Sequence, residues 1–162
     1  MPPLVLAYFG EDIGAMMALA DRGLKLNPGF ARGWHVSAVL HYWAGLPDIA
    51  IEHGETSLRL SPRARVGTTQ FIIGCAYFAT RRFAEAIPKL LIAIQEDPSF
   101  PDPYRYLAAC YAHTGRLDDA KEIVERLRAV TPLVVPSASE LRNAEQRELY
   151  LSGLRLAAGE AA

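Results

Sequence analysis

Four stretches of the chain end in proline at nearly regular intervals, after similar short runs of residues. The prolines are Pro28, Pro62, Pro98 and Pro132, so their spacings are 62 − 28 = 34, 98 − 62 = 36 and 132 − 98 = 34 residues. Proline donates no backbone hydrogen bond and disfavours the helical conformation of the residue before it, so each of these prolines is expected to end a helix. A period of this length indicates a protein built from stacked supersecondary units.

Within each period, two amphipathic segments meet at a short turn. Glycine supplies the left-handed helix cap at Gly10, Gly45 and Gly115, whereas Arg81 stands at the corresponding point of the third turn. Pro88 lies inside a predicted helix, where we expect a bend or a frayed start. The pattern predicts helices near residues 3–9, 12–26, 30–44, 47–60, 65–80, 83–96, 102–114 and 117–130.

Small residues recur at equivalent points of the repeats, where they would let paired helices approach closely. They are Ala38, Gly74 and Ala108 in the first helices, and Ala50, Ala86, Ala120, Gly23, Ser57 and Ala93 in the second helices. The larger Trp34, Tyr104, Tyr77 and Tyr111 fill the spaces between. This pattern resembles the tetratricopeptide (TPR) repeat family over residues 1–132, with departures at Met16, Gln70, His41 and Leu127.

The resemblance implies an all-α fold, an α-α superhelix of about four helical hairpins with a C-terminal capping helix. The TPR repeats would occupy residues 1–133, as a truncated repeat at 1–28 and full repeats at 29–62, 63–98 and 99–132. Residues 134–162 would form a connector and a capping helix with Tyr150, Leu151, Leu154, Ala157 and Ala158 on one stripe. The shortened first repeat suggests a fragment of a longer chain.

Composition narrows the kind of partner. A net charge of -1 with 22% charged residues gives no basic excess, which argues against nucleic acid or an anionic membrane surface. The N-terminus lacks a signal-peptide pattern, and no apolar run approaches the roughly 18 residues of a membrane span. Two cysteines cannot build a disulfide framework. We therefore expect a cytoplasmic protein, and the TPR resemblance implies that its partner is a protein or peptide.

Several short sequence segments are similar to one TPR subgroup, the C-terminal repeats of bacterial class III adenylate cyclases. They are Asn27–Trp34, Trp43–Gly45, Ala50–His53, Phe100–Arg105, Gly115–Ala120 and the ending Arg147–Arg155. This resemblance implies a regulatory or self-association module, whose partner would be a second copy of itself or the catalytic part of its own parent chain. None of the cyclase's metal-binding aspartates has a counterpart in this sequence.

The sequence offers no catalytic, cofactor-binding or metal-binding motif. His35, His41, His53 and His113 contain no i, i+4 pair, and neither HExxH nor CxxC occurs. We expect His41 to be packed and hydrogen-bonded and His53 to be solvated. Cys75 and Cys110 are interpreted as small buried hydrophobic residues, because no base can be assigned to activate a thiol.

In TPR stacks the first helix of each pair lines a concave face, and the resemblance places a partner-binding groove there. Its candidate residues are Arg32, His35, Val39, Tyr42, Trp43, Phe71, Cys75, Phe78, Arg105, Ala109 and His113. The Lys and Asn residues that grip a C-terminal carboxylate in some TPRs are missing. The remaining apolar and aromatic floor, with Arg32 and Arg105 at its flanks, suits an amphipathic helix or an apolar strand.

Two interpretations of that floor stay open, because exposed apolar patches rarely remain uncovered. It is either a groove for a partner or a surface covered by the chain's own C-terminal segment or by a second copy. For the function, the sequence favours a non-enzymatic interaction module of a cyclase-like signalling protein. A free-standing peptide-binding adaptor is the alternative, and an enzyme with an unfamiliar site is a distant third.

Overall fold

A computed structural model describes residues 12–62 and 66–160 of the chain. Within these ranges the regular elements are all helices: α2 (Ile13–Leu26), α3 (Ala31–Trp43), α4 (Pro47–Leu60), α5 (Gly67–Ala79), α6 (Phe83–Glu96), α7 (Pro101–His113), α8 (Leu117–Val130) and α9 (Ala144–Ala158). Seven of the eight helices predicted before Pro132 appear within two residues of their expected ends. The eighth, near 3–9, lies outside the described residues.

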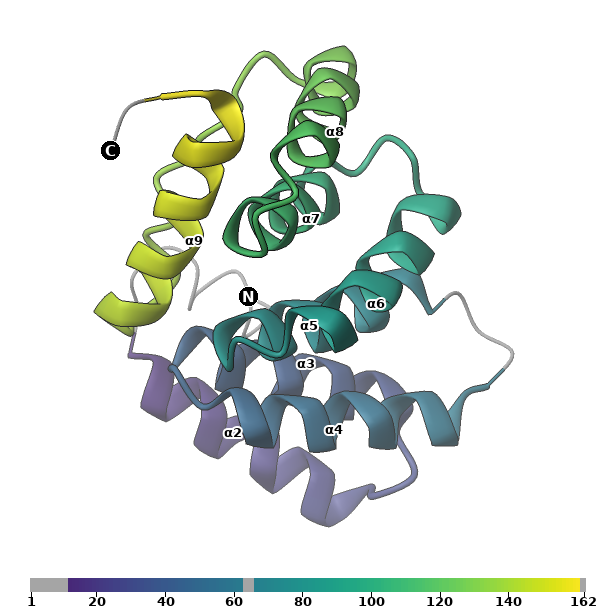
Figure 1. The fold of residues 1–162 in the computed structure, drawn as a ribbon. Coiled ribbons are helices and arrows are strands. Elements are labelled where there is room, and N and C mark those ends of the chain that lie inside the picture. The colour runs from purple at the N-terminus through teal and green to yellow at the C-terminus, as the bar shows by residue number, and fades with distance from the viewer. Residues whose placement is uncertain (1–11, 63–65, 161–162) are drawn as a thin grey trace.

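The helices stack as successive hairpins (Figure 1). Each helix from α2 to α8 packs on the next one along the chain, and the first helices of neighbouring hairpins also touch, α3 with α5 and α5 with α7. α9 continues this row by packing against α7, with further contacts to α8 and α5. The structure therefore confirms an α-α superhelix with an additional C-terminal helix.

The two extra residues of the third period fall between the end of α4 and the start of α5. α5 begins 67 − 60 = 7 residues after α4 ends, whereas the equivalent steps are 31 − 26 = 5 and 101 − 96 = 5. The Glu96 carboxylate accepts a hydrogen bond from the Gly67 backbone N–H at 2.7 Å, so α6, the partner helix of the same hairpin, caps this late helix start. Pro88 sits inside α6, yet the helix begins at Phe83. The expectation of a frayed start there is wrong.

The turns inside the hairpins share one backbone arrangement. Gly45, Arg81 and Gly115 have positive φ angles of 83°, 59° and 76°. The N–H of the following residue donates to a carbonyl five residues earlier, as Arg82 does to Tyr77 at 2.9 Å and Arg116 to Tyr111 at 2.8 Å. This is the Schellman arrangement that glycine usually completes. Arg81 therefore takes the glycine position, as the sequence indicates.

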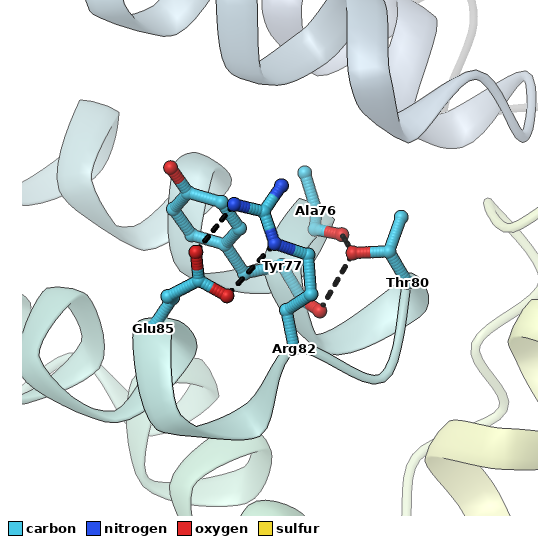
Figure 2. Close-up of polar contacts among 5 residues, drawn as sticks. All are labelled: Ala76, Tyr77, Thr80, Arg82 and Glu85. Atoms are coloured by element: carbon cyan, nitrogen blue, oxygen red, sulfur yellow. Dashed lines mark hydrogen bonds and ion pairs between the residues drawn. The ribbon is translucent and has the colours of Figure 1, made fainter.

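Side chains reinforce the turn between α5 and α6 (Figure 2). The Thr80 hydroxyl donates to the Tyr77 carbonyl at 3.0 Å, and Arg82 pairs with Glu85 through Nε at 2.8 Å while its guanidinium lies 4.5 Å from the Tyr77 ring centroid. The turn between α7 and α8 repeats this set with Thr114, Arg116, Asp119 and Tyr111. Surface pairs of this kind contribute little individually, so we interpret them as fixing the turn geometry.

Small residues hold the hairpins together as predicted. Ala38, Ala50, Ala86, Ala108 and Ala120 are all completely buried. At Gly74 a Cβ would lie only 3.0 Å from the Leu90 side chain, so even one extra carbon would press on the paired helix. Close helix packing at these points explains the residue sizes in the repeat.

The Arg81 conformation predicts a reciprocal pair of stability changes. Arg81→Gly should raise the free energy of unfolding by about 1 kcal/mol, because glycine adopts positive φ without steric strain. Gly115→Ala should lower it by about 1 kcal/mol for the same reason, since nothing lies within 4 Å of the added Cβ. Urea denaturation followed by circular dichroism measures both. Equal stabilities of the two variants would contradict this account of the turn.

Candidate functional site

The concave face of the stack is covered more heavily toward the C-terminal end. α7 buries ten of its 13 residues, whereas its hairpin partner α8 buries four of its 14. A helix that packs on one side only keeps a polar face, so α7 must be covered on both sides. The cover is the chain's own C-terminal segment, residues 131–158, which consists of a connector (residues 131–143) and α9.

Aromatic contacts seat this C-terminal segment on the groove. The Tyr150 ring of α9 stacks on Tyr106 of α7 with centroids 4.2 Å apart and lies 6.4 Å edge-on from Phe78 of α5. The Tyr106 hydroxyl is 2.7 Å from the hydroxyl of Tyr42 on α3. Burial of all three tyrosines raises their pKa values, so they stay protonated and available as hydrogen-bond donors. Three hairpins are thus joined under α9.

Backbone groups of the C-terminal segment also bond to the groove. The Arg142 backbone N–H donates to the Trp43 carbonyl at 2.8 Å, and His113 Nε2 donates to the Leu149 carbonyl at 2.7 Å. The side-chain Nε2 of Gln146 also donates to the Tyr42 carbonyl at 3.1 Å. Arg105 holds the connector through bonds to the carbonyls of Val134 and Leu133. The segment is therefore an integrated part of the fold.

The groove residues predicted from the sequence divide into three groups by exposure. Six are buried: Val39, Tyr42, Cys75, Phe78, Arg105 and Ala109. Four are partly buried, namely His35, Trp43, Phe71 and His113, and Arg32 is exposed. Arg105 does not flank an open groove as expected, because its side chain is 7% exposed and bonded to the connector. The C-terminal segment contacts part of this floor, at Tyr42, Phe78 and Arg105.

Coverage is incomplete, and a cavity of about 390 Å³ remains between α3, α5, α7 and the connector. Aromatic rings form much of its wall: Tyr42, Trp43, Phe71, Phe100, Tyr106 and Tyr150. Its charged lining residues are Asp102, Arg105 and Glu140. Sequence reasoning missed Tyr106, Phe100 and Glu140, because the first two fall outside the expected groove positions and the third lies in the connector.

The three charged residues at the cavity differ in the ion pairs and hydrogen bonds that they make. Arg105 pairs with Asp102 at 2.5 Å. The Glu140 side chain makes no salt bridge among the described residues, and burial raises its pKa, although a backbone hydrogen bond opposes the shift. The charge of Asp102 raises it further, whereas Arg142 and Arg105 oppose the rise. A partly desolvated carboxylate therefore borders the aromatic wall.

The histidines are packed into the structure. His41 is 6% exposed and its Nδ1 donates to the Ser37 carbonyl at 2.8 Å, which confirms the expectation for it. The expectation that His53 is solvated is wrong. Its Nδ1 lies 3.0 Å from the Ser37 hydroxyl, and its ring packs 4.9 Å from both Trp34 and His41. The neighbouring α3 supplies this cover, which the pattern of α4 alone does not reveal.

The cysteines provide no reactive centre. Both are free and completely buried, as expected, and burial raises the pKa of Cys110 to about 12. Among the residues described, no group of three or more His, Cys, Asp or Glu residues is placed to hold a metal ion. Across those residues no helix combines the length and apolar character of a membrane span.

The packing of α9 predicts a contrast between two leucines of that helix. Leu154 is completely buried and Leu156 is 45% exposed. Leu154→Ala should lower the free energy of unfolding by about 2 to 5 kcal/mol, because it opens a cavity where α9 packs on the stack. Leu156→Ala should change it by less than about 0.5 kcal/mol. Chemical denaturation tests both, and similar losses would mean that α9 is not seated as described.

The partly buried histidines predict acid sensitivity. Burial lowers the pKa of His35 and of His53, and nearby charges on Arg32 and His41 respectively lower them further. The unfolded chain then binds more protons than the folded chain, so stability falls as the pH drops below the unfolded value of about 6.5. Thermal unfolding between about pH 7.5 and about pH 5.5 measures this. The double variant His35→Gln, His53→Gln should lose less stability over that range, and an unchanged slope would refute the cause.

Comparisons with known proteins agree with this geometry. Residues 77–144 match the family model of the tetratricopeptide repeat. A curated relative, the cytochrome c-type biogenesis protein CycH of Rhizobium meliloti, is 28% identical over 134 residues, covering 81% of this chain. The chain spans about a third of that relative's length, 35%. Neither match supports the resemblance to adenylate cyclases.

Solved structures match most of the chain. A thermophilic TPR protein of Thermus thermophilus is 24% identical, with a TM-score of 0.70 and coverage of 97% of this chain and 83% of that one. MamA is 21% identical with a TM-score of 0.68, covering 91% and 88%. YrrB, a TPR protein with an unusual peptide-binding site, is 18% identical with a TM-score of 0.65, covering 97% and 81%. The chain therefore has the fold of a TPR solenoid, and its residues 77–144 are similar to the tetratricopeptide repeat model.

Proposed function

We propose that this chain is a non-catalytic interaction module that holds a segment of another polypeptide at its concave face. The observation that carries the proposal is the aromatic cavity left between the first helices of the hairpins and the connector. Aromatic side chains are frequent anchors of protein interfaces, because they bury large areas with little loss of conformational freedom. Cavities lined in this way accept side chains of a bound segment.

The cavity restricts the mode of binding. Capture of a C-terminal carboxylate would need exposed cationic or amide groups on the floor, but Val39, Cys75 and Ala109 occupy the relevant points and are buried. A complete partner helix lying along the groove would collide with α9, which already packs there. The proposal is therefore an extended segment that crosses the free part of the groove and inserts a side chain into the cavity.

This proposal favours the adaptor alternative over the cyclase-associated one. The peptide-binding site of YrrB fits an adaptor, whereas the cyclase context depends on short sequence phrases alone. The match to CycH supports a second context, in which the module is one part of a larger biogenesis protein. The full reading frame around the coding sequence distinguishes these contexts. A cytoplasmic location stays part of the proposal, based on two buried free cysteines.

The test is selection of binding peptides from a random library displayed on phage, followed by measurement of Kd for the best sequence. Phe71 lines the cavity and its ring is 5.0 Å from that of Phe100. Phe71→Ala should weaken binding about 10- to 30-fold, the effect of losing an anchor worth about 2 kcal/mol. Leu91→Ala is the matched control, because Leu91 is 42% exposed on α6, outside the cavity lining.

Circular dichroism and thermal unfolding should accompany the measurement, so that loss of binding is separated from loss of fold. If Phe71→Ala stays folded and binds as tightly as the unmodified chain, the cavity is not the binding site. If no peptide is selected at all, the interaction-module proposal fails for peptides of that length.

A further inference from the structure

The charge balance at the cavity is unusual for a site enclosed by aromatic rings. Two carboxylates, Asp102 and Glu140, face one guanidinium, Arg105, so the lining has a formal charge of −2 + 1 = −1. Carboxylates are rarely left beside apolar walls without a partner, because desolvation without compensation costs free energy. The excess negative charge indicates the chemistry of an occupant.

Arg105 makes its hydrogen bonds to other groups of the fold. Its Nε donates to the Val134 carbonyl at 3.1 Å, one terminal nitrogen donates to Asp102 at 2.5 Å, and the other donates to the Leu133 carbonyl at 2.5 Å. Each of its three nitrogen atoms therefore has an acceptor, and the side chain is only 7% exposed. Arg105 fixes the connector and does not offer its charge to an incoming anion.

The carboxylates retain the capacity to accept hydrogen bonds. The Asp102 side chain is 41% exposed and only one of its oxygens is bonded to Arg105. The Glu140 side chain has neither a hydrogen bond to another side chain nor a salt bridge among the described residues, and it borders the same cavity. Arg142 lies close enough to act on the charge of Glu140, but it does not line the cavity.

The aromatic wall complements a positive charge. Phe71 meets Phe100 at 73° and Tyr106 at 75°, with centroids 5.0 and 5.7 Å apart, so ring faces and edges alternate around the space. A cation over an aromatic face is attracted by the ring's quadrupole, and its aliphatic stem packs on the same rings. The volume of about 390 Å³ is ample for one long side chain.

We propose that this cavity binds a basic side chain, an arginine or lysine of the bound segment. The aromatic rings would surround its aliphatic stem, and Asp102 and Glu140 would lie beside its charged group. This inference rests on the proposed function, since the basic side chain belongs to the segment that the module holds. It names the chemistry of the partner as a positively charged, extended peptide. An apolar side chain in the same space would leave Glu140 desolvated and unpaired.

The experiment compares basic probes with neutral ones of the same shape, using the full chain labelled with ¹⁵N. N-acetyl-arginine methylamide is titrated against its citrulline counterpart, and the lysine probe against norleucine, with the Trp43 indole signal as the readout. At least one basic probe should bind about tenfold more tightly than its neutral counterpart, equivalent to about 1.4 kcal/mol. Glu140→Gln should remove most of this preference, whereas Glu122→Gln, an equal charge change on the exposed face of α8, should not.

The outcomes separate this inference from the proposed function. Equal or absent binding of all four probes overturns the inference, as does a preference that survives Glu140→Gln. If selected peptides bind through Phe71 but tolerate replacement of their basic residues by citrulline or norleucine, the basic-side-chain inference fails while the interaction module stands. If neither peptides nor probes bind, both fail.

Discussion

The close approach of α9 to α7 is the contact on which the shape of the concave face depends. At Gly153 of α9 a Cβ would lie 2.6 Å from His113 Nε2 and 2.9 Å from the Ala109 Cβ. The two helices can approach this closely only because Gly153 has no side chain. The short distance allows Tyr150 to stack on Tyr106 and His113 to bond to the Leu149 carbonyl. The position of α9 in turn fixes the connector, which forms one wall of the cavity.

Local backbone chemistry made the helical scaffold predictable from the sequence. Proline and the left-handed turn positions act within a few residues of themselves. The ends of α2, α3, α4, α6 and α7 therefore follow from Pro28, Gly45, Pro62, Pro98 and Gly115 without knowledge of tertiary contacts. Arg81 breaks the glycine pattern, yet its place in the repeat predicts its positive φ, because it stands at the same turn position as Gly45 and Gly115. Small residues such as Ala86 and Ala120 were likewise predictable, since every hairpin repeats the same close contact.

The covered groove could not be predicted in the same way. The apolar stripe of α9 looks the same whether the helix only caps the last hairpin or also reaches across the concave face to Tyr42. The family pattern assigns Val39 and Cys75 to a ligand surface, but both side chains are buried in the structure. No sequence pattern marks Glu140 as a cavity residue, because the path of the connector determines its position there. The partial burial of His53 could not be predicted for the same reason, because the residues that pack on it lie on α3.

The sequence left self-coverage and partner binding as alternatives, yet the structure makes them compatible. An open concave face would leave Asp102 and any nearby carboxylate in high dielectric, where their attraction for a cation is weak. The connector narrows the face to a cavity and brings Glu140 to the aromatic wall, where water is partly excluded and charge pairing is stronger. On the proposed function, the C-terminal segment therefore narrows a generic groove to a smaller and more selective site.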